Sequence, residues 1–196
     1  MSSDSSYIDP RTGIQRNKLG LKTQEELSKV EYLVVAKRSV ELSANPVNGN
    51  FDLKHLQAIH KHQFQDVYDW AGKIRTVNIS KGNSPFARTE FIESFMKDVH
   101  RRLEKVNFLR GLGKKEFVEK FTDVYGDINA AHPFREGNGR STREFMVQLA
   151  EQAGYTFDQS VIKNKEAWNK ASEQSVHGQM EPLKTILNDA IQPRER

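Results

Sequence analysis

Apolar residues recur every three to four positions along most of this chain, which is the spacing of helices that bury one face. A capping box formed by Thr23 and Glu26 predicts where the first helix begins, and a second helix is expected from about Asp52. Asn45-Pro46 and Asn48-Gly49 would break the chain between the two. The apolar positions of these helices are Leu27, Val30, Leu33, Val34, Val40, Leu53, Leu56, Ile59 and Phe64.

Helical spacing returns at Thr89 and continues through most of the remaining chain. The last of three central stripes ends at Gly154, and two further helices are expected around residues 161–168 and 183–191. The apolar positions of the central stripes are Ile92, Phe95, Val99, Leu103, Val106, Phe117, Phe121, Val124, Tyr125, Ile128, Phe145, Met146, Leu149 and Ala150.

One segment departs from helical spacing. Residues 75–80 alternate polar and apolar, Lys81-Gly82-Asn83-Ser84-Pro85 supplies a turn, and Phe86-Ala87 returns, which predicts a short β-hairpin. It is the only clear strand signal in the sequence. The expected fold class is therefore all-α, with a single helical domain over residues 21–191 and an irregular N-terminal segment over residues 1–20.

Composition narrows the class of protein. A chain of 196 residues is long enough for one domain with a sizeable core. No apolar run approaches the roughly 18–20 residues of a membrane span, and the polar residues 1–7 do not resemble a secretion signal. The sequence has no cysteine, which excludes disulfides and thiolate zinc sites and is compatible with a reducing, cytoplasmic location.

The net charge of +4 gives no strong indication of a nucleic-acid partner. Basic residues are spread along the chain, and several have an acid one helical turn away, as Glu25 has Lys29 and Lys37 has Glu41. We therefore expect a mixed, solvated surface, with no direct nucleic-acid contact and no membrane contact.

Candidate chemistry is concentrated between residues 132 and 143, which read His-Pro-Phe-Arg-Glu-Gly-Asn-Gly-Arg-Ser-Thr-Arg. Pro133 makes continuation of the preceding helix unfavourable. Gly137, Asn138 and Gly139 suit the start of a new helix, where exposed backbone N–H groups and the helix dipole form an anion cradle. The segment is therefore expected to be a helix–loop–helix junction that binds an anion.

The charged residues of this segment fit a polyphosphate site. Arg140 and Arg143 are three residues apart and would share one helix face beside the cradle. Glu136 could hold a magnesium ion that neutralises phosphate charge, and the ordinary pKa of His132, about 6.5, suits a general base. Each residue alone could simply cap a helix, shape a turn or lie exposed to solvent. Their combination in one short segment favours a catalytic site.

The segment resembles the Fic motif, His-x-Phe-x-Asp/Glu-Gly-Asn-Gly-Arg-x-x-Arg, at every specified position. Tyr68-Asp69-Trp70-Ala71-Gly72-Lys73-Ile74-Arg75 resembles the segment that leads into the flap of that family, and Asn83-Ser84-Pro85-Phe86-Ala87 resembles the return of the flap. Residues 149–155 resemble the end of the motif helix. The resemblance covers about residues 10–190 and is closest to the bacterial toxin and secreted-effector branch.

This resemblance implies a protein adenylyltransferase that moves AMP from ATP to a Tyr, Thr or Ser hydroxyl and releases pyrophosphate. His132 would take the hydroxyl proton, and Glu136 would coordinate Mg²⁺ between the α- and β-phosphates. Backbone N–H groups of Gly137-Asn138-Gly139 would hold the phosphates, with Arg140 at the β- and Arg143 at the γ-phosphate. Relatives that transfer phosphate depart from the Gly-Asn-Gly-Arg segment, so its presence favours AMP transfer.

The resemblance also assigns residues outside the motif. Lys73 and Ile74 would lie near the nucleotide, and Phe134 would face the core beneath the loop. The flap would pair with the target backbone as an added strand, and Phe86 would help to clamp the modified side chain. The flap residues expected to meet the target are Val77, Asn78, Ile79, Ser80 and Phe86.

Many Fic proteins are inhibited by a helix with the pattern Ser/Thr-x-x-x-Glu-Gly/Asn, whose glutamate pairs with the second motif arginine, here Arg143. The nearest match, Thr89-x-x-x-Glu93, is followed by Ser94 and lies beside the flap. The resemblance therefore implies a separate small antitoxin that inserts a glutamate near Arg143. The chain would be the toxin of such a pair, with targets such as DNA gyrase and topoisomerase IV, or an effector translocated into a host cell.

Two readings from other classes compete with this one. The first is a non-enzymatic Fic module that only binds nucleotide or a partner. Binding alone needs neither the base His132 nor the carboxylate Glu136. The second is a metal hydrolase that combines His132 with other histidines. No carboxylate completes a recognisable zinc spacing for it. The other histidines considered are His55, His60 and His62.

Overall fold

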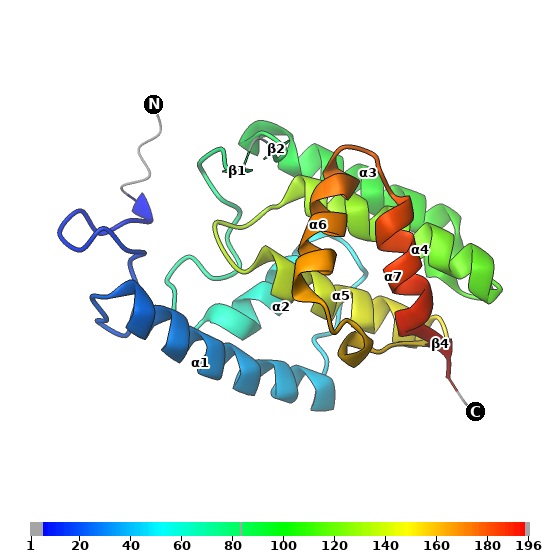
Figure 1. The fold of residues 1–196 in the computed structure, drawn as a ribbon, viewed down its shortest axis with the longest axis horizontal. Coiled ribbons are helices and arrows are strands. Elements are labelled where there is room, and N and C mark those ends of the chain that lie inside the picture. Colours follow the sequence, from blue (N-terminus) through cyan, green and yellow to red (C-terminus); the bar gives the residue numbers. More distant parts are fainter. Residues whose placement is uncertain (1–5, 83, 195–196) are drawn as a thin grey trace.

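The computed structural model describes residues 6–82 and 84–194, and helices dominate it (Figure 1). Asn83 of the expected turn and residues 1–5 of the expected N-terminal segment lie outside the described residues. The helices are α1 (Gln24–Ala44), α2 (Leu53–Phe64), α3 (Ile92–Lys105), α4 (Lys114–Ala131), α5 (Asn138–Gln152), α6 (Lys165–Val176) and α7 (Glu181–Ala190). The all-α prediction is confirmed. None of the helices described is long and apolar enough to span a membrane.

Side-chain caps explain where several helices begin. Thr23 Oγ1 accepts from the backbone N–H of Glu26 at 3.3 Å, so the predicted cap of α1 is confirmed. The helix expected over 161–168 is displaced, because Gln159–Val161 forms a short 3₁₀ turn and Asn164 caps α6 through the N–H of Ala167 at 2.9 Å. The prediction was wrong there because it followed apolar spacing and overlooked this cap.

Strand pairing differs from the prediction in two places. The hairpin is limited to β1 (Ser80–Lys81) and β2 (Ser84–Pro85), so regular strand structure over residues 75–79 was a wrong prediction. A second antiparallel pair, β3 (Tyr155–Phe157) with β4 (Ile191–Pro193), was missed. Its strands are too short to produce a clear alternating pattern, and β4 begins directly after α7.

The main core lies around α4 and α5. Helix α4 contacts α3, α5, α6 and α7, and α5 also packs on α2 and β3. Figure 1 shows α5 running through the middle of the molecule between α2 and α6. Phe145, Met146, Leu149 and Ala150 are buried along α5, as their spacing predicted. The helix that begins with the proposed phosphate cradle is therefore firmly fixed in the core.

A smaller core joins the N-terminal segment to α1 and the end of α2. Its buried residues are Tyr7, Ile14, Leu27, Val35, Phe64, Val67, Tyr68, Trp70 and Val77. Leu33 and Val40 of α1, counted in the apolar stripe, are instead 60% and 70% exposed, while the charged Glu31 is 8% exposed. The buried face of α1 thus contains a carboxylate, which is costly unless the carboxylate is paired.

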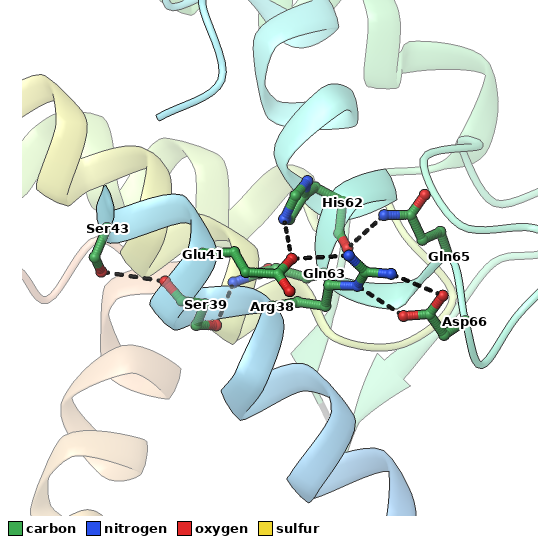
Figure 2. A network of polar contacts seen from close by, with 8 residues as sticks. All are labelled: Arg38, Ser39, Glu41, Ser43, His62, Gln63, Gln65 and Asp66. Carbon is green, nitrogen blue, oxygen red and sulfur yellow. Dashed lines mark hydrogen bonds and ion pairs between the residues drawn. The ribbon is translucent and has the colours of Figure 1, made fainter. Parts of the chain in front are cut away.

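Polar contacts fix α1 against α2 and α5. Figure 2 shows Arg38 of α1 bound to Asp66 and to Glu41, with Nε of Arg38 2.7 Å from the Asp66 carboxylate. Gln63 of α2 donates to Ser39 Oγ at 3.1 Å and accepts from Ser141 Oγ of α5 at 2.8 Å. These contacts therefore link α1, α2 and α5 close to the first turn of α5.

Candidate active site

His132 lies where α4 ends and the motif loop begins. Its backbone is left-handed, with φ 44° and ψ 59°, and its N–H donates to the carbonyl of Ile128 at 3.0 Å. This conformation costs a non-glycine residue roughly 1–2 kcal/mol, so neighbouring contacts must maintain it. Pro133 follows and prevents the helix from continuing.

The contacts of the His132 ring define its tautomer. Nδ1 lies 3.1 Å from the carbonyl oxygen of Asn129, which can only accept, so Nδ1 carries the proton and Nε2 keeps its lone pair. The pKa of His132 is lowered to about 4, mainly by burial and in smaller part by the positive charges of Arg75 and Lys81. The ring is therefore neutral at pH 7 and has one nitrogen able to accept a proton.

Glycine is required where the loop meets α5. Gly137 has φ 78°, and a Cβ there would lie 2.2 Å from Cζ of Phe64. Asn138 closes the loop, because its side chain accepts from the N–H of Phe134 at 2.8 Å and donates to the Phe134 carbonyl at 2.7 Å. The loop thus turns tightly into α5, whose first N–H groups have no acceptor within the helix. Gly139 is exposed in this first turn.

Arg140 is held by a carboxylate that the sequence did not indicate. Its Nη2 lies 2.5 Å from Oε1 of Glu31 and 4.0 Å from Glu136, and its guanidinium is 4.7 Å above the Phe64 ring. The second oxygen of Glu31 accepts from the hydroxyl of Tyr68. Glu31 lies four residues from the buried Leu27 and Val35, but nothing near it in the sequence indicates its distant partner Arg140.

Glu136 is the exposed carboxylate of the loop. Its side chain is 46% exposed and accepts from the N–H of Gly137 at 3.0 Å. Over residues 6–82 and 84–194, no three metal-binding side chains are grouped as a metal centre. A single carboxylate that leaves further positions to phosphate and water oxygens is the usual protein contribution to Mg²⁺ binding, so the residues present fit this ion.

A cavity joins the base, the cradle and the second arginine. It is lined by His132 and Phe86 on one side, by Gly139 and Arg143 of α5, and by Trp168 of α6, among other residues. In the described part of the chain Arg143 has no ion pair with a carboxylate. The structure therefore brings together four of the predicted site residues: His132, Gly139, Arg143 and Phe86.

The predicted flap residues differ in their exposure and in the hydrogen bonds that they already make. Phe86 stacks on His132 with ring centroids 3.7 Å apart. Val77 is buried and its carbonyl accepts from Arg75, while Ile79 pairs through its carbonyl with the N–H of Phe86 at 3.2 Å. Asn78 and Ser80 are exposed, although Asn78 also accepts from Thr89 through its side chain.

Lys73 and Ile74 do not line this cavity. Lys73 is exposed, and Ile74 is half-buried against the main core. Their predicted place beside a nucleotide stays a prediction.

His60 supports the motif loop from beneath. Its Nδ1 accepts from the N–H of Gly72 at 2.8 Å, so Nε2 carries the proton and donates to the Glu136 carbonyl at 3.0 Å. The ring stacks on Phe134 at 3.9 Å and is fully buried, and this burial lowers the pKa of His60 to about 4. The structure thereby explains why Phe134 faces the core, as predicted.

The other histidines do not form a metal centre with His132. His55 is bonded to the Val47 carbonyl at 2.9 Å and to Gln148 at 3.0 Å. His62 contacts Glu41 at 3.2 Å (Figure 2) and does not line the cavity. With no metal cluster among the described residues, the metal-hydrolase alternative has no structural support.

Comparison with known proteins agrees with the motif and the fold. The model of the Fic/DOC family matches residues 50–150. The chain is 43% identical to protein adenylyltransferase VbhT of Bartonella schoenbuchensis, over 94% of this chain but only 38% of VbhT. It is 37% identical to the probable protein adenylyltransferase Fic of Escherichia coli, over 94% of this chain and 91% of that protein.

Solved structures give the same result. BepC, a VirB-translocated effector of Bartonella tribocorum solved with bound AMPPNP, matches the whole of this chain over the whole of its own. The TM-score is 0.91 and the sequence identity is 30%. With a complete motif, the corresponding fold and these relatives, the chain belongs to the Fic/DOC family.

Proposed function

We propose that this protein is a nucleotidyltransferase that transfers AMP from ATP to a hydroxyl side chain of a target protein. The observation that carries the proposal is a neutral His132 at a cavity that also contains Gly139 and Arg143. A base beside an anion cradle supports group transfer better than nucleotide binding alone. The names of the VbhT and Escherichia coli relatives support AMP as the transferred group.

In this mechanism, Nε2 of His132 takes the proton from the target hydroxyl. The oxygen attacks the α-phosphorus in line, a new P–O bond forms, and the bond to the bridging oxygen of the β-phosphate breaks, so that pyrophosphate leaves. The N-terminus of α5, Arg140 and Arg143 offset the negative charge of the phosphates. Mg²⁺, when bound at Glu136, supplies further charge neutralisation.

The flap provides the second half of the proposed site. The exposed residues Asn78 and Ser80 lie on a segment that suits pairing with an extended part of the target, and Phe86 lies over the base. Because backbone pairing depends little on target sequence, the identity of the target is determined outside this hairpin. The ATP-site roles of Lys73 and Ile74 remain part of the proposal.

The test is incubation of the protein with ATP, Mg²⁺ and a bacterial lysate, followed by mass spectrometry of modified peptides. We expect AMP on a Tyr, Thr or Ser side chain. Glu136→Ala, or chelation of Mg²⁺, should suppress the modification, whereas Glu25→Ala on the exposed face of α1 should not. Absence of AMP-modified peptides with the wild-type protein, in both a bacterial lysate and a parallel host-cell lysate, would refute the proposal.

We further propose that a separate antitoxin controls this activity in the bacterial cytoplasm. The supporting observation is that Arg143 has no carboxylate partner in the part of the chain described, while Arg140 has one. A glutamate from a small partner could pair with Arg143 and exclude the γ-phosphate. We expect that expression of this chain alone arrests growth. Co-expression of the partner should relieve the arrest, but co-expression of a partner with that glutamate changed to glycine should not. A silent chain that becomes active after trimming would contradict it.

Delivery into a host cell is the second candidate role. It is supported by the likeness to BepC, a translocated effector. Modification of host rather than bacterial proteins in parallel lysates would favour it over the toxin role.

A further inference from the structure

Arg75 is a buried cation whose position the motif does not explain. Only 2% of the residue is exposed, and it is among the largest fully buried side chains. Within the described residues its guanidinium has no carboxylate partner, and burial lowers its pKa. An unpaired buried charge is costly, so the groups around Arg75 must compensate for it.

The compensation comes from four backbone carbonyls in two different places. Nε donates to His132 at 2.8 Å and Nη2 to Ala131 at 3.3 Å, both at the C-terminal end of α4. Nη1 donates to Val77 at 2.8 Å, and Nη2 also donates to Ala87, so the same guanidinium binds both sides of the flap. Carbonyls at a helix C-terminus lack partners within the helix and form the negative end of its dipole, which favours a cation there.

Backbone contacts extend this junction. The N–H of Arg75 donates to the Pro133 carbonyl at 2.9 Å, and the N–H of Ala87 donates to the Ala130 carbonyl at 2.9 Å. The left-handed His132 is thus held on its carbonyl side by Arg75, while Phe86, next to Ala87, stacks on its ring. The Arg75 side chain therefore contacts both the residue that carries the base and the two sides of the flap.

We propose that Arg75 is a positioning residue that holds the base His132 and the flap in one fixed arrangement. This inference rests on the proposed function, because it gives the arrangement a use: the flap presents the target hydroxyl to Nε2. Lysine cannot replace the guanidinium, since a single ammonium cannot span carbonyls on both α4 and the flap.

The test compares Arg75→Lys and Arg75→Gln with Leu187→Ala, a core variant on α7 that is far from the flap in sequence and fully buried. All rates are expressed per folded molecule. We expect both Arg75 variants to lower kcat by about 10- to 100-fold, the usual penalty for a misplaced reacting group, and to raise KM for the target. ATP affinity should not change, and Leu187→Ala should keep the wild-type kcat.

A kcat for the Arg75 variants equal to that of Leu187→Ala would overturn the inference and leave Arg75 a purely structural residue. So would a loss confined to ATP affinity. If the wild-type protein transfers no AMP, the proposed function fails instead, and the two failures are thereby distinguished.

If the Arg75 variants do not fold, native-state hydrogen exchange on the wild-type protein provides the test. The amides of Arg75, Ala87 and His132 are each hydrogen-bonded across or beside this junction. They should become exposed in one cooperative opening with a shared dependence on denaturant. Exchange of the Ala87 amide in an opening that leaves Arg75 and His132 protected would overturn the inference.

Discussion

The rings of His60 and His132 both lie at the motif loop, but their surroundings differ. His60 lies beneath the loop, and His132 lies at its mouth. Burial lowers the pKa of each to about 4, and each stacks on a phenylalanine. Both nitrogens of His60 are bonded to backbone, whereas His132 uses only Nδ1 and borders the cavity.

This difference shows that a shifted pKa does not by itself identify a catalytic base. Burial lowers the pKa of both the structural histidine and the candidate base, although only His60 is fully buried. The distinction is that His132 has a nitrogen with a free lone pair and lines a cavity beside an anion cradle. His60 therefore supports the loop structurally, whereas His132 has the geometry that the proposed base needs.

Replacing His132 should have the largest effect, because it should lower AMP transfer without lowering the affinity for ATP. His132→Ala is expected to lower AMP transfer by about 10²–10⁴-fold, because a positioned base is lost. Affinity for ATP, measured by calorimetry, should stay near that of the wild-type protein, since the ring contacts the incoming hydroxyl. Near-wild-type transfer by this variant would remove His132 from the mechanism.

Replacing His60 should give the opposite pattern. His60→Leu leaves the N–H of Gly72 and the carbonyl of Glu136 without their partner, at a cost of about 1–3 kcal/mol for each buried group. Urea denaturation should show this loss of stability, while His132→Ala should lose less. Equal stability of His60→Leu and the wild-type protein would show that these contacts are dispensable.

His60 should also make the stability of the fold depend on pH. The pKa of His60 is lowered from 6.5 to about 4 in the fold, so the unfolded chain binds the proton first as pH falls. Stability from this group is complete above pH 6.5 and decreases towards pH 4, by at most about 3 kcal/mol. Urea midpoints at pH 7 and pH 5 should therefore differ less in His60→Leu than in the wild-type protein. An identical pH dependence in both would contradict this assignment.

The smallest expected effect concerns Arg140. Glu31→Gln keeps a hydrogen-bonding group near Tyr68 but removes the negative charge that holds Arg140. We expect ADP binding to weaken by about fivefold, roughly 1 kcal/mol, with AMP binding unchanged because AMP lacks the β-phosphate. Tighter ADP binding would instead mean that Glu31 competes with the phosphate for Arg140.

The sequence predicted the junction that contains the site better than the residues that support it. Pro133 and Gly137 placed a break and a helix start correctly, because their backbone requirements are local. Glu31, His60 and Arg75 act on residues 109, 76 and 57 positions away. Such contacts depend on tertiary packing and leave no local pattern.

The central claim is that AMP is the group transferred from ATP to the target protein. ATP labelled on a single phosphate tests this claim most directly. The wild-type protein is incubated with Mg²⁺, a lysate and ATP labelled on either the α- or the γ-phosphate, and the proteins are then separated. Our account predicts that protein-bound label comes from the α-position alone and disappears with His132→Ala. Label transferred from the γ-position would identify a kinase and contradict the account.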